Sequence, residues 1–318
     1  MSLPYGFPEP SLVEAGDVTF SVHEAGPKGG LPVLLLHGWP ELAFSWAPLV
    51  APLVAAGYRL IMPDIKGFGG TSRPLDPMAY RMSVMADDYR RLLSALGIEK
   101  AVFVGHDWGG AIVWPLAQRA PDRALGVASF CTPYPELAPA PPLSIWQRRM
   151  GEQFYINAFQ DPQLPDRVFA GREHDFFRFM FRPGPPRSVW PKLMKSALNL
   201  PERFATDKGP WPDCIVSNEI IDIYAGAYAA SGHQGPTMLY RAIDLQWEER
   251  GAFDPNIDVP ALMVTAERDM MLPPESSAGM EQRCKNLSRG ALDSGHWVMW
   301  ERPQQAAEIL LRWLRDLP

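Results

Sequence analysis

Short apolar runs alternate with amphipathic stretches in the first and last parts of the chain. Continuous apolar runs are typical of buried parallel strands, whereas apolar residues at helical spacing are typical of helices that cover a sheet. This alternation predicts an α/β fold, a mostly parallel sheet with helices on both faces. The expected strands are 18–23, 32–36, 60–62, 101–104, 127–130, 261–265 and 290–292, and the expected helices are 45–56, 83–96, 108–119, 275–283 and 303–314.

The alternation stops after residue 136, where sequence rich in proline and aromatic residues begins, and it resumes at residue 261. Proline fixes φ and removes a backbone donor, so clusters of prolines are typical of extended linkers. One such cluster comprises Pro133, Pro135, Pro139, Pro141 and Pro142. We interpret it as the exit from a sheet-forming core into an inserted unit. The expected organisation is a first core segment over 1–136, a mainly helical cap over 137–250 and a second core segment over 251–318.

The composition narrows the class of protein. The 318 residues are 47% hydrophobic and 21% charged, as in ordinary globular proteins. The net charge of −6 argues against nucleic acid or an anionic membrane as a partner, and no apolar stretch is long enough to span a bilayer. Residues 1–6 lack the features of a signal peptide. The number of cysteines is odd, and none of the three, Cys131, Cys214 and Cys284, forms a CxxC motif. We therefore expect a cytoplasmic protein without a disulfide framework or a zinc site, and the sequence leaves its oligomeric state open.

The most informative chemistry follows the apolar run 101–104, where residues 105–109 read Gly-His-Asp-Trp-Gly. This spacing matches the G-x-S-x-G turn that presents a nucleophile between a strand and a helix, with Asp107 in the place of serine. A carboxylate with a pKa of about 4 is ionised at neutral pH, so it needs no base and forms an ester with the carbon that it attacks. A nearby base can then activate water against that ester. The motif predicts a two-step hydrolase that opens an epoxide or a carbon–halogen bond at a saturated carbon.

Two further candidates complete the chain order nucleophile, acid, base. Asp269 follows the expected strand 261–265 and would orient an imidazole and stabilise its protonated form. His296 follows the last expected strand and would take a proton from water. All three therefore come at the carboxyl ends of strands, where open α/β sheets bind their ligands. Glu267 is the alternative acid, and Asp107 by itself could be a helix N-cap.

Ester hydrolysis passes through an oxyanion, which needs two backbone N–H donors that face the nucleophile carboxyl. We expect one from Trp108, directly after the nucleophile, and the other from Trp39 in the sequence His-Gly-Trp-Pro. His37 and His106 flank the site and are interpreted as supporting or packed histidines. The remaining histidines are interpreted as structural, and they are His23, His174 and His233.

These motifs resemble those of the α/β-hydrolase-fold epoxide hydrolases of the soluble type, over nearly the whole chain. The sequence His-Gly-Trp-Pro-Glu over 37–41 is similar to the family's HGxP oxyanion motif, and Gly-Phe-Gly-Gly-Thr over 67–71 is similar to its small-residue turn. Residues 105–110, 260–269 and 295–297 resemble its nucleophile, acid and base segments. The resemblance implies an α/β-hydrolase fold with an inserted helical cap, and chemistry that requires no metal and no cofactor.

The resemblance also implies two cap tyrosines that hydrogen-bond the epoxide oxygen and protonate it as the ring opens. The segments around Tyr155 and Tyr240 resemble those that carry the pair. A phenol with a pKa of about 10 is protonated at neutral pH yet can donate to a strong base. Tyr224 and Tyr228 also fall in the cap, and their four-residue spacing favours packing. Glu41 resembles a family position that places water or relays protons, with structural packing as the alternative.

The implied reaction converts a small apolar epoxide and water to a vicinal diol through a hydroxyalkyl ester on Asp107. The nearest alternative is a haloalkane dehalogenase, which shares the aspartate nucleophile but needs a halide cradle in place of two phenols. Fluoroacetate dehalogenases carry arginine after the nucleophile, so Trp108 argues against them. An alternative from another class is a non-catalytic ligand-binding homologue. Met238 and Leu239 replace the Asn-Trp that commonly precedes the second tyrosine, which indicates a reshaped pocket wall.

Two prolines predict local features of the backbone. Pro115 lies inside the helix expected after Asp107, where it removes a hydrogen bond, so we expect a kink over 111–114. The family resemblance and the tight turn predict a cis peptide bond between Trp39 and Pro40.

Overall fold

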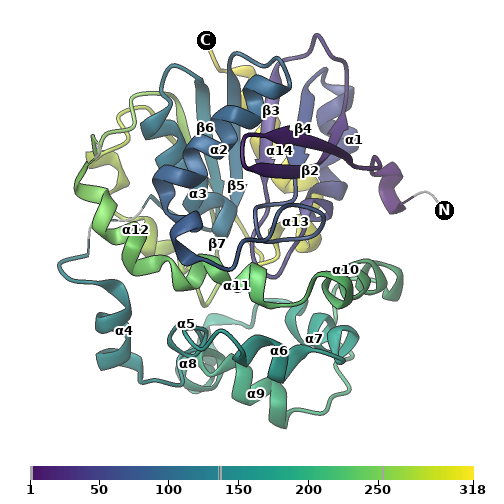
Figure 1. Cartoon of the computed structure of the whole chain (residues 1–318), viewed down its shortest axis with the longest axis vertical. Helices are drawn as coiled ribbons and strands as arrows, with labels where there is room; N and C mark the ends of the chain where they lie inside the picture. The colour runs from purple at the N-terminus through teal and green to yellow at the C-terminus, as the bar shows by residue number, and fades with distance from the viewer. Residues whose placement is uncertain (1–2, 135, 137, 253) are drawn as a thin grey trace.

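Eight strands form one sheet in the order β1-β2-β4-β3-β5-β6-β7-β8 (Figure 1). This computed structural model describes residues 3–134, 136, 138–252 and 254–318, and the number of strands refers to them. β1 is antiparallel to β2 and β2 is antiparallel to β4, whereas the remaining pairs are parallel. The strands are β1 (Ser11–Ala15), β2 (Val18–Ala25), β3 (Pro32–Leu36), β4 (Arg59–Pro63), β5 (Ala101–His106), β6 (Ala124–Phe130), β7 (Ala261–Ala266) and β8 (Leu287–Leu292).

The central parallel strands are covered on both faces, which explains why they appear in the sequence as continuous apolar runs. Every residue of β5 is buried, and so is all of β3 except its first residue. The seven expected strands are all present, and the predicted mostly parallel sheet is confirmed. β1 is not among the expected strands, because this edge strand is largely exposed and carries no apolar run.

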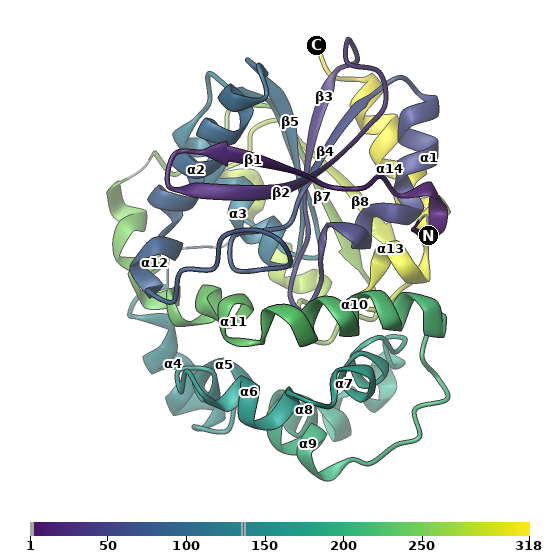
Figure 2. The same ribbon diagram turned by 45° about the vertical axis from the view of Figure 1, so that its right-hand side comes forward.

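Helices cover both faces of the sheet, as predicted (Figures 1 and 2). α1 (Ala47–Ala55) and α14 (Pro303–Arg315) pack together on one face, and α2 (Met82–Ala95) and α3 (Trp108–Arg119) pack together on the other. The sequence of α14 shows why it lies there. Its buried residues recur at helical spacing along one side, and they are Ala306, Ala307, Leu310, Trp313 and Leu314.

The prediction of a helix over 275–283 is wrong. Two short 3-10 turns occupy this stretch, η6 (Pro274–Ser277) and η7 (Met280–Gln282). Gly279 between them has a φ of +81°, and a glycine in this left-handed conformation ends a helix rather than continuing it. The other expected helices are present, the first of them as the turn η2 (Ala43–Trp46) followed by α1.

The two proline predictions have different outcomes. The peptide bond between Trp39 and Pro40 is cis, as predicted. α3 continues from Trp108 to Arg119 with Pro115 inside it. The ring nitrogen of Pro115 cannot donate a hydrogen bond to the preceding turn, and the kink expected there stays a prediction.

Nine α-helices lie between β6 and β7 in the described part of the chain, and they gather beyond one end of the sheet (Figure 1). We call residues 138–252 the helical insert; the boundary expected at residue 137 falls outside the described residues. Figure 2 shows α10 and α11 next to the sheet, with α5 to α9 farther away. The helices are α4 (Pro142–Met150), α5 (Tyr155–Ala158), α6 (Leu164–Phe169), α7 (Glu173–Met180), α8 (Trp190–Leu198), α9 (Leu200–Thr206), α10 (Asn218–Ser231), α11 (Gln234–Arg241) and α12 (Ile243–Glu249).

Aromatic side chains give the insert an apolar centre of its own. Six phenylalanines among its described residues are fully shielded from solvent, and they are Phe159, Phe169, Phe176, Phe177, Phe181 and Phe204. Edge-to-face and tilted contacts link several of these rings. Among the described residues, no helix is long and apolar enough to cross a membrane.

Candidate active site

Asp107 lies in a sharp turn between β5 and α3. Its φ of +50° and ψ of −117° are strained for a residue with a side chain, and such a turn presents the side chain at the end of the sheet. The turn requires neighbours without side chains. A Cβ atom added to Gly109 would lie 2.6 Å from the His37 carbonyl oxygen, and one added to Gly38 would lie 2.6 Å from Asp107 Oδ1. These close approaches explain why glycine occupies both positions.

Asp107, Asp269 and His296 meet at the carboxyl end of the sheet. His296 Nδ1 lies 2.7 Å from Asp269 Oδ2, and His296 Nε2 lies 3.6 Å from Asp107 Oδ2. The other oxygen of Asp269 accepts hydrogen bonds from the N–H groups of Met271 and Leu272, at 2.9 and 3.0 Å. The imidazole therefore lies between two carboxylates, and its partner Asp269 is fixed by backbone donors.

The two carboxylates shift the pKa of the imidazole, and the imidazole shifts the pKa of each carboxylate. Burial alone would lower the pKa of His296, but the charge and the hydrogen bond of Asp269, together with the charge of Asp107, raise it to about 9. Burial raises the pKa of Asp107 against the opposing effect of His296. Burial would also raise the pKa of Asp269, but the charge and hydrogen bond of His296 lower it overall. With Asp107 ionised, the imidazole holds its second proton at neutral pH.

The backbone N–H groups of Trp39 and Trp108, the two expected oxyanion donors, interact with the Asp107 carboxyl. Trp39 N–H donates to Asp107 Oδ1 at 2.7 Å. The hydrogen bonds of the Trp39 and Trp108 N–H groups both lower the pKa of Asp107, although burial outweighs them. Donors in these positions stabilise negative charge that develops on the carboxyl oxygen.

A buried chain of hydrogen bonds lies behind the site. Glu41 Oε2 accepts from Gly38 N–H at 3.0 Å and lies 2.7 Å from His106 Nδ1. His106 Nε2 lies 2.8 Å from the His296 carbonyl oxygen, and because a carbonyl only accepts, this nitrogen carries a proton. Burial would raise the pKa of Glu41, but the charge and hydrogen bond of His106 lower it to about 2. His37 is also buried, and both its ring nitrogens bond to backbone groups.

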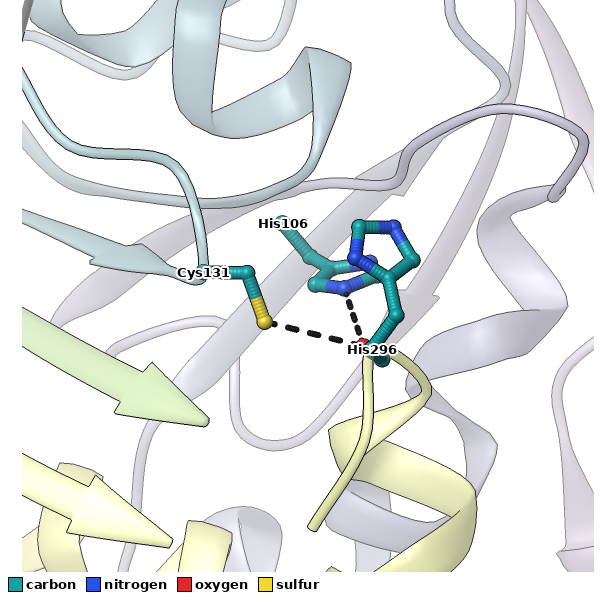
Figure 3. A group of neighbouring side chains, drawn as sticks. All are labelled: His106, Cys131 and His296. Carbon is teal, nitrogen blue, oxygen red and sulfur yellow. Dashed lines mark hydrogen bonds between the residues drawn. The ribbon is translucent and has the colours of Figure 1, made fainter. Parts of the chain in front are cut away.

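Cys131 belongs to the same cluster, although the sequence did not mark it as a site residue. It directly follows β6 with a φ of +67°, and its Sγ lies 3.6 Å from the His296 carbonyl oxygen. This oxygen therefore accepts from both Cys131 and His106 (Figure 3). The signal that could have identified Cys131 is its place directly after a strand, which it shares with Asp107.

The three side chains in Figure 3 are also the one group of three potential ligands for a metal ion within the described ranges. Their ligand atoms lie within 4.8 Å of one another. Burial first, and the charge of Asp269 next, raise the pKa of the Cys131 thiol well above its usual range, which disfavours the thiolate that a metal ion requires. The cluster fits a set of hydrogen bonds around one carbonyl better than a metal centre.

Tyr155 of α5 and Tyr240 of α11 lie over the residues that flank the nucleophile. Their ring centroids are 5.6 Å apart. The Tyr240 ring lies 4.9 Å from Trp108, and the Tyr155 ring is stacked on Trp39 at 6.4 Å. Burial first, and the charge of Asp107 in addition, raise the pKa of both phenols. Both hydroxyls are therefore protonated donors at neutral pH.

The other two tyrosines of interest, Tyr224 and Tyr228, are buried on α10, in agreement with the expected packing. The Tyr224 hydroxyl lies 2.6 Å from Ser45 Oγ and so joins the insert to the core. The Tyr228 ring packs edge-to-face on Phe177 at 5.1 Å.

The remaining candidates make contacts elsewhere. Glu267, the alternative acid, lies 3.9 Å from Arg187, whereas Asp269 is the carboxylate bonded to the imidazole. His23 bonds to a backbone carbonyl oxygen, His174 is exposed beside an aspartate, and His233 is buried among aromatic rings of the insert. These surroundings are consistent with structural roles for the three histidines.

Known proteins share both the sequence and the fold of this chain. Residues 32–303 match the family described as the alpha/beta hydrolase fold. Epoxide hydrolase A of Mycobacterium tuberculosis is 34% identical over 319 residues, which cover 98% of this chain and 99% of that protein. Bifunctional epoxide hydrolase 2 of Rattus norvegicus is 33% identical over 314 residues, which cover 96% of this chain but 56% of that longer protein.

A solved structure is similar to this chain over nearly its whole length. The crystal structure of Epoxide Hydrolase A from Mycobacterium thermoresistibile has a TM-score of 0.87 and 32% sequence identity, and the match covers 98% of this chain and 99% of that one. Because the matches cover 98% of this chain, the similarity includes the helical insert as well as the sheet. The chain therefore belongs to the epoxide hydrolase family of α/β-hydrolase-fold proteins.

Proposed function

We propose that this protein hydrolyses an epoxide to a vicinal diol through a covalent ester on Asp107. The observation that carries the proposal is an aspartate at the strand–helix turn, between the His296–Asp269 pair and the two phenols of Tyr155 and Tyr240. A carboxylate suits attack on a saturated carbon, and phenols suit the oxygen that leaves it. The names of the similar proteins support the same reaction.

In the first step, Asp107 Oδ2 attacks one ring carbon while Trp39 N–H holds Oδ1. Tyr155 and Tyr240 hydrogen-bond the epoxide oxygen, and one of them gives it a proton as the carbon–oxygen bond breaks. The raised pKa of both phenols keeps them protonated until that moment. The products of this step are a hydroxyalkyl ester on Asp107 and a tyrosinate.

Ester formation prepares the base for the second step. It removes the negative charge that lies 3.6 Å from His296 Nε2. Because this charge helps to raise the pKa of His296, its loss lowers that pKa. The imidazolium proton then neutralises the tyrosinate through solvent, and the imidazole becomes free to accept a proton.

In the second step, His296 takes a proton from water, and the hydroxide attacks the carboxyl carbon of Asp107. The N–H groups of Trp39 and Trp108 stabilise the oxyanion, and Asp269 stabilises the imidazolium. The ester bond then breaks, and the diol alkoxide takes the proton of the carboxylic acid that forms. Asp107 is ionised and His296 is protonated once more, so the cycle closes with one epoxide and one water consumed.

We further propose that Glu41 places the attacking water. Its Oε2 is occupied by Gly38 N–H and His106, whereas its Oε1 is buried and has no hydrogen-bond partner among the described residues. A buried oxygen that stays unpaired costs about 1–3 kcal/mol, so packing alone is a poor account of this side chain. Water bound to Oε1 would satisfy it.

The proposed substrate is a small apolar epoxide, and residues 137–250 act as a cap over the site. Support comes from the aromatic rings around Trp39, including Phe159 at 5.3 Å and Phe176 at 5.9 Å. Met238 and Leu239, which depart from the family pattern, are fully buried on the same helix as Tyr240. The proposed location is cytoplasmic, which agrees with three free cysteines.

The test is product analysis with styrene oxide, a trans-disubstituted epoxide and a bromoalkane. We expect diol from at least one epoxide, and we expect Asp107→Asn to lower turnover roughly 10³-fold or more, since an amide is a poor nucleophile. Asp122→Asn is the matched control, because Asp122 is an exposed aspartate paired with Arg90. Bromide release without diol would make the protein a haloalkane dehalogenase, and tight binding without turnover would make it a binding module.

A further inference from the structure

The loop that carries His296 contacts the helical insert as well as the core. We call residues 293–297 the base loop; it runs from β8 to α13 (Val298–Glu301). We call residues 180–186 the strap; it runs from the end of α7 to the turn η4 (Arg187–Val189). The strap contacts the base loop on both sides of His296.

On one side of His296, Trp297 joins the base loop to the strap. Its Nε1–H donates to the Met180 carbonyl oxygen at 2.7 Å, and its ring lies edge-to-face with Phe181 at 5.0 Å. The same carbonyl oxygen accepts from Arg182 N–H at 2.8 Å, and Phe181 has a φ of −80° and a ψ of +68°, which is an inverse γ-turn. This turn presents both the Met180 carbonyl and the Phe181 ring to one indole.

On the other side of His296, Gly184 and Gly295 touch backbone to backbone. A Cβ atom added to Gly295 would lie 2.5 Å from Gly184 Cα, and one added to Gly184 would lie 2.5 Å from the Arg268 carbonyl oxygen. Neither glycine has a positive φ, so close contact rather than backbone conformation requires them. Burial raises the pKa of Glu301, whereas hydrogen bonds from the N–H groups of these two glycines lower it, so one carboxyl binds both segments.

The core holds the start and the middle of this loop. Arg268 N–H donates to the Ser294 carbonyl oxygen at 2.8 Å. His106 and Cys131 both donate to the His296 carbonyl oxygen (Figure 3). The two residues next to His296, Gly295 and Trp297, contact the strap as well. The direction of the imidazole toward Asp269 and Asp107 therefore depends on the insert as well as on the sheet.

We propose that Trp297 is a positioning residue, whose bond to the strap keeps the His296 imidazole aligned with Asp269 and Asp107. This inference rests on the proposed function and extends it, because it gives the insert a part in ester hydrolysis. His296 serves that second step, whereas Asp107 and the two phenols serve ester formation. Loss of the bond between Trp297 and the strap should therefore slow hydrolysis of the ester more than its formation.

The experiment compares Trp297→Phe with Trp190→Phe. Trp297→Phe keeps an aromatic ring and removes the N–H bonded to Met180. Trp190 is a matched control, because its Nε1–H donates to the Pro185 carbonyl oxygen of the same strap, at 3.0 Å, from within the insert. Both steps are followed in single turnovers with styrene oxide, by rapid quenching and mass spectrometry of the peptide that contains Asp107.

We expect Trp297→Phe to slow ester hydrolysis roughly tenfold to a hundredfold while ester formation changes by less than about twofold, since a small misplacement of a catalytic group has effects of this size. The ester should then accumulate in Trp297→Phe and not in Trp190→Phe. Equal slowing of both steps, or the same change in both variants, would mean that the strap supports only the fold, and the proposal would be wrong.

A second readout does not depend on turnover. The ring of His296 is titrated by nuclear magnetic resonance in the wild type and in Trp297→Phe. A looser bond to Asp269 should lower the pKa of His296 in the variant, and an unchanged titration would overturn the proposal. If the wild type makes no diol, the proposed function fails, and this titration still decides whether Trp297 positions the imidazole.

Discussion

His296 holds its proton more tightly in the folded protein than an isolated histidine does. The negative charges of Asp269 and Asp107 raise its pKa from 6.5 to about 9, against the effect of burial. A group whose pKa is raised by folding stabilises the fold fully below its unfolded pKa, and this stability is lost as the pH rises through the folded pKa. The window for His296 therefore runs from pH 6.5 to about 9.

We predict that the free energy of unfolding of the wild type falls between about pH 6 and pH 10 by at most about 3 kcal/mol more than that of His296→Gln. The reason is that glutamine carries no proton to lose in this range. Urea unfolding of both proteins at the two pH values measures the difference. Parallel pH dependences would show that the imidazole is not held by its carboxylates.

The sequence located Asp107, Asp269 and His296 because each follows an apolar run that forms a strand, and parallel strands bring their carboxyl ends together. It did not locate Cys131 in the cluster or the bond from Trp297 to Met180. These contacts depend on how the insert and the loops pack against the sheet, which no local pattern encodes.

At the level of secondary structure, the nucleophile turn depends on how closely α3 approaches β3. Gly109 in the first turn of α3 lies against the backbone of residues 36 and 37, with no room for a Cβ atom. Gly226, in the middle of α10, has open space at the corresponding position. Close packing of the backbone therefore requires glycine at position 109, whereas the space around position 226 would accept a Cβ atom.

We predict that Gly109→Ala destabilises the fold by about 3 kcal/mol or more, because the helix must move away from the sheet. Gly226→Ala is the control, and it should be neutral or stabilising by up to about 1 kcal/mol, since alanine favours the helix. Thermal unfolding of both variants provides the measurement. Similar melting temperatures for the two would contradict this account of the turn.

The elements predicted wrongly were those with weak apolar patterns. β1 is an edge strand with a largely exposed surface, so its pairing with β2 leaves little trace in the sequence. The stretch 275–283 has a helix-like composition, but Gly279 adopts a left-handed conformation and divides it into two turns. The buried strands were predicted because burial on both faces imposes a continuous apolar run.

At the scale of the whole molecule, the site exists only when the insert and the core are folded together. Tyr155 and Tyr240 are far apart in the chain, yet their rings lie 5.6 Å from each other and next to Trp39 and Trp108. The Tyr224 hydroxyl and Ser45 Oγ, 2.6 Å apart, add a further bond between the two parts. The two tyrosines were predicted only through the family resemblance, because cap tyrosines without such a motif are usually packing residues.

We predict that the Tyr155→Phe/Tyr240→Phe double variant slows ester formation by roughly 10²- to 10⁴-fold, since no phenol remains to protonate the epoxide oxygen. Hydrolysis of ester already formed should change little. Tyr228→Phe is the control, because the Tyr228 hydroxyl is buried in the insert and has no hydrogen-bond partner among the described residues. Stopped-flow and rapid-quench kinetics measure the two steps. Rapid ester formation in the double variant would remove the phenols from the mechanism.

The most direct test of the account is to trap the ester. His296→Gln lacks the base of the second step but keeps Asp107 and both phenols, so the variant should form the ester and fail to hydrolyse it. After incubation with styrene oxide, we predict that its intact mass rises by the mass of one epoxide and that the added mass maps to Asp107. An unmodified variant, or a label on another residue, together with diol formation by the wild type, would contradict the covalent mechanism.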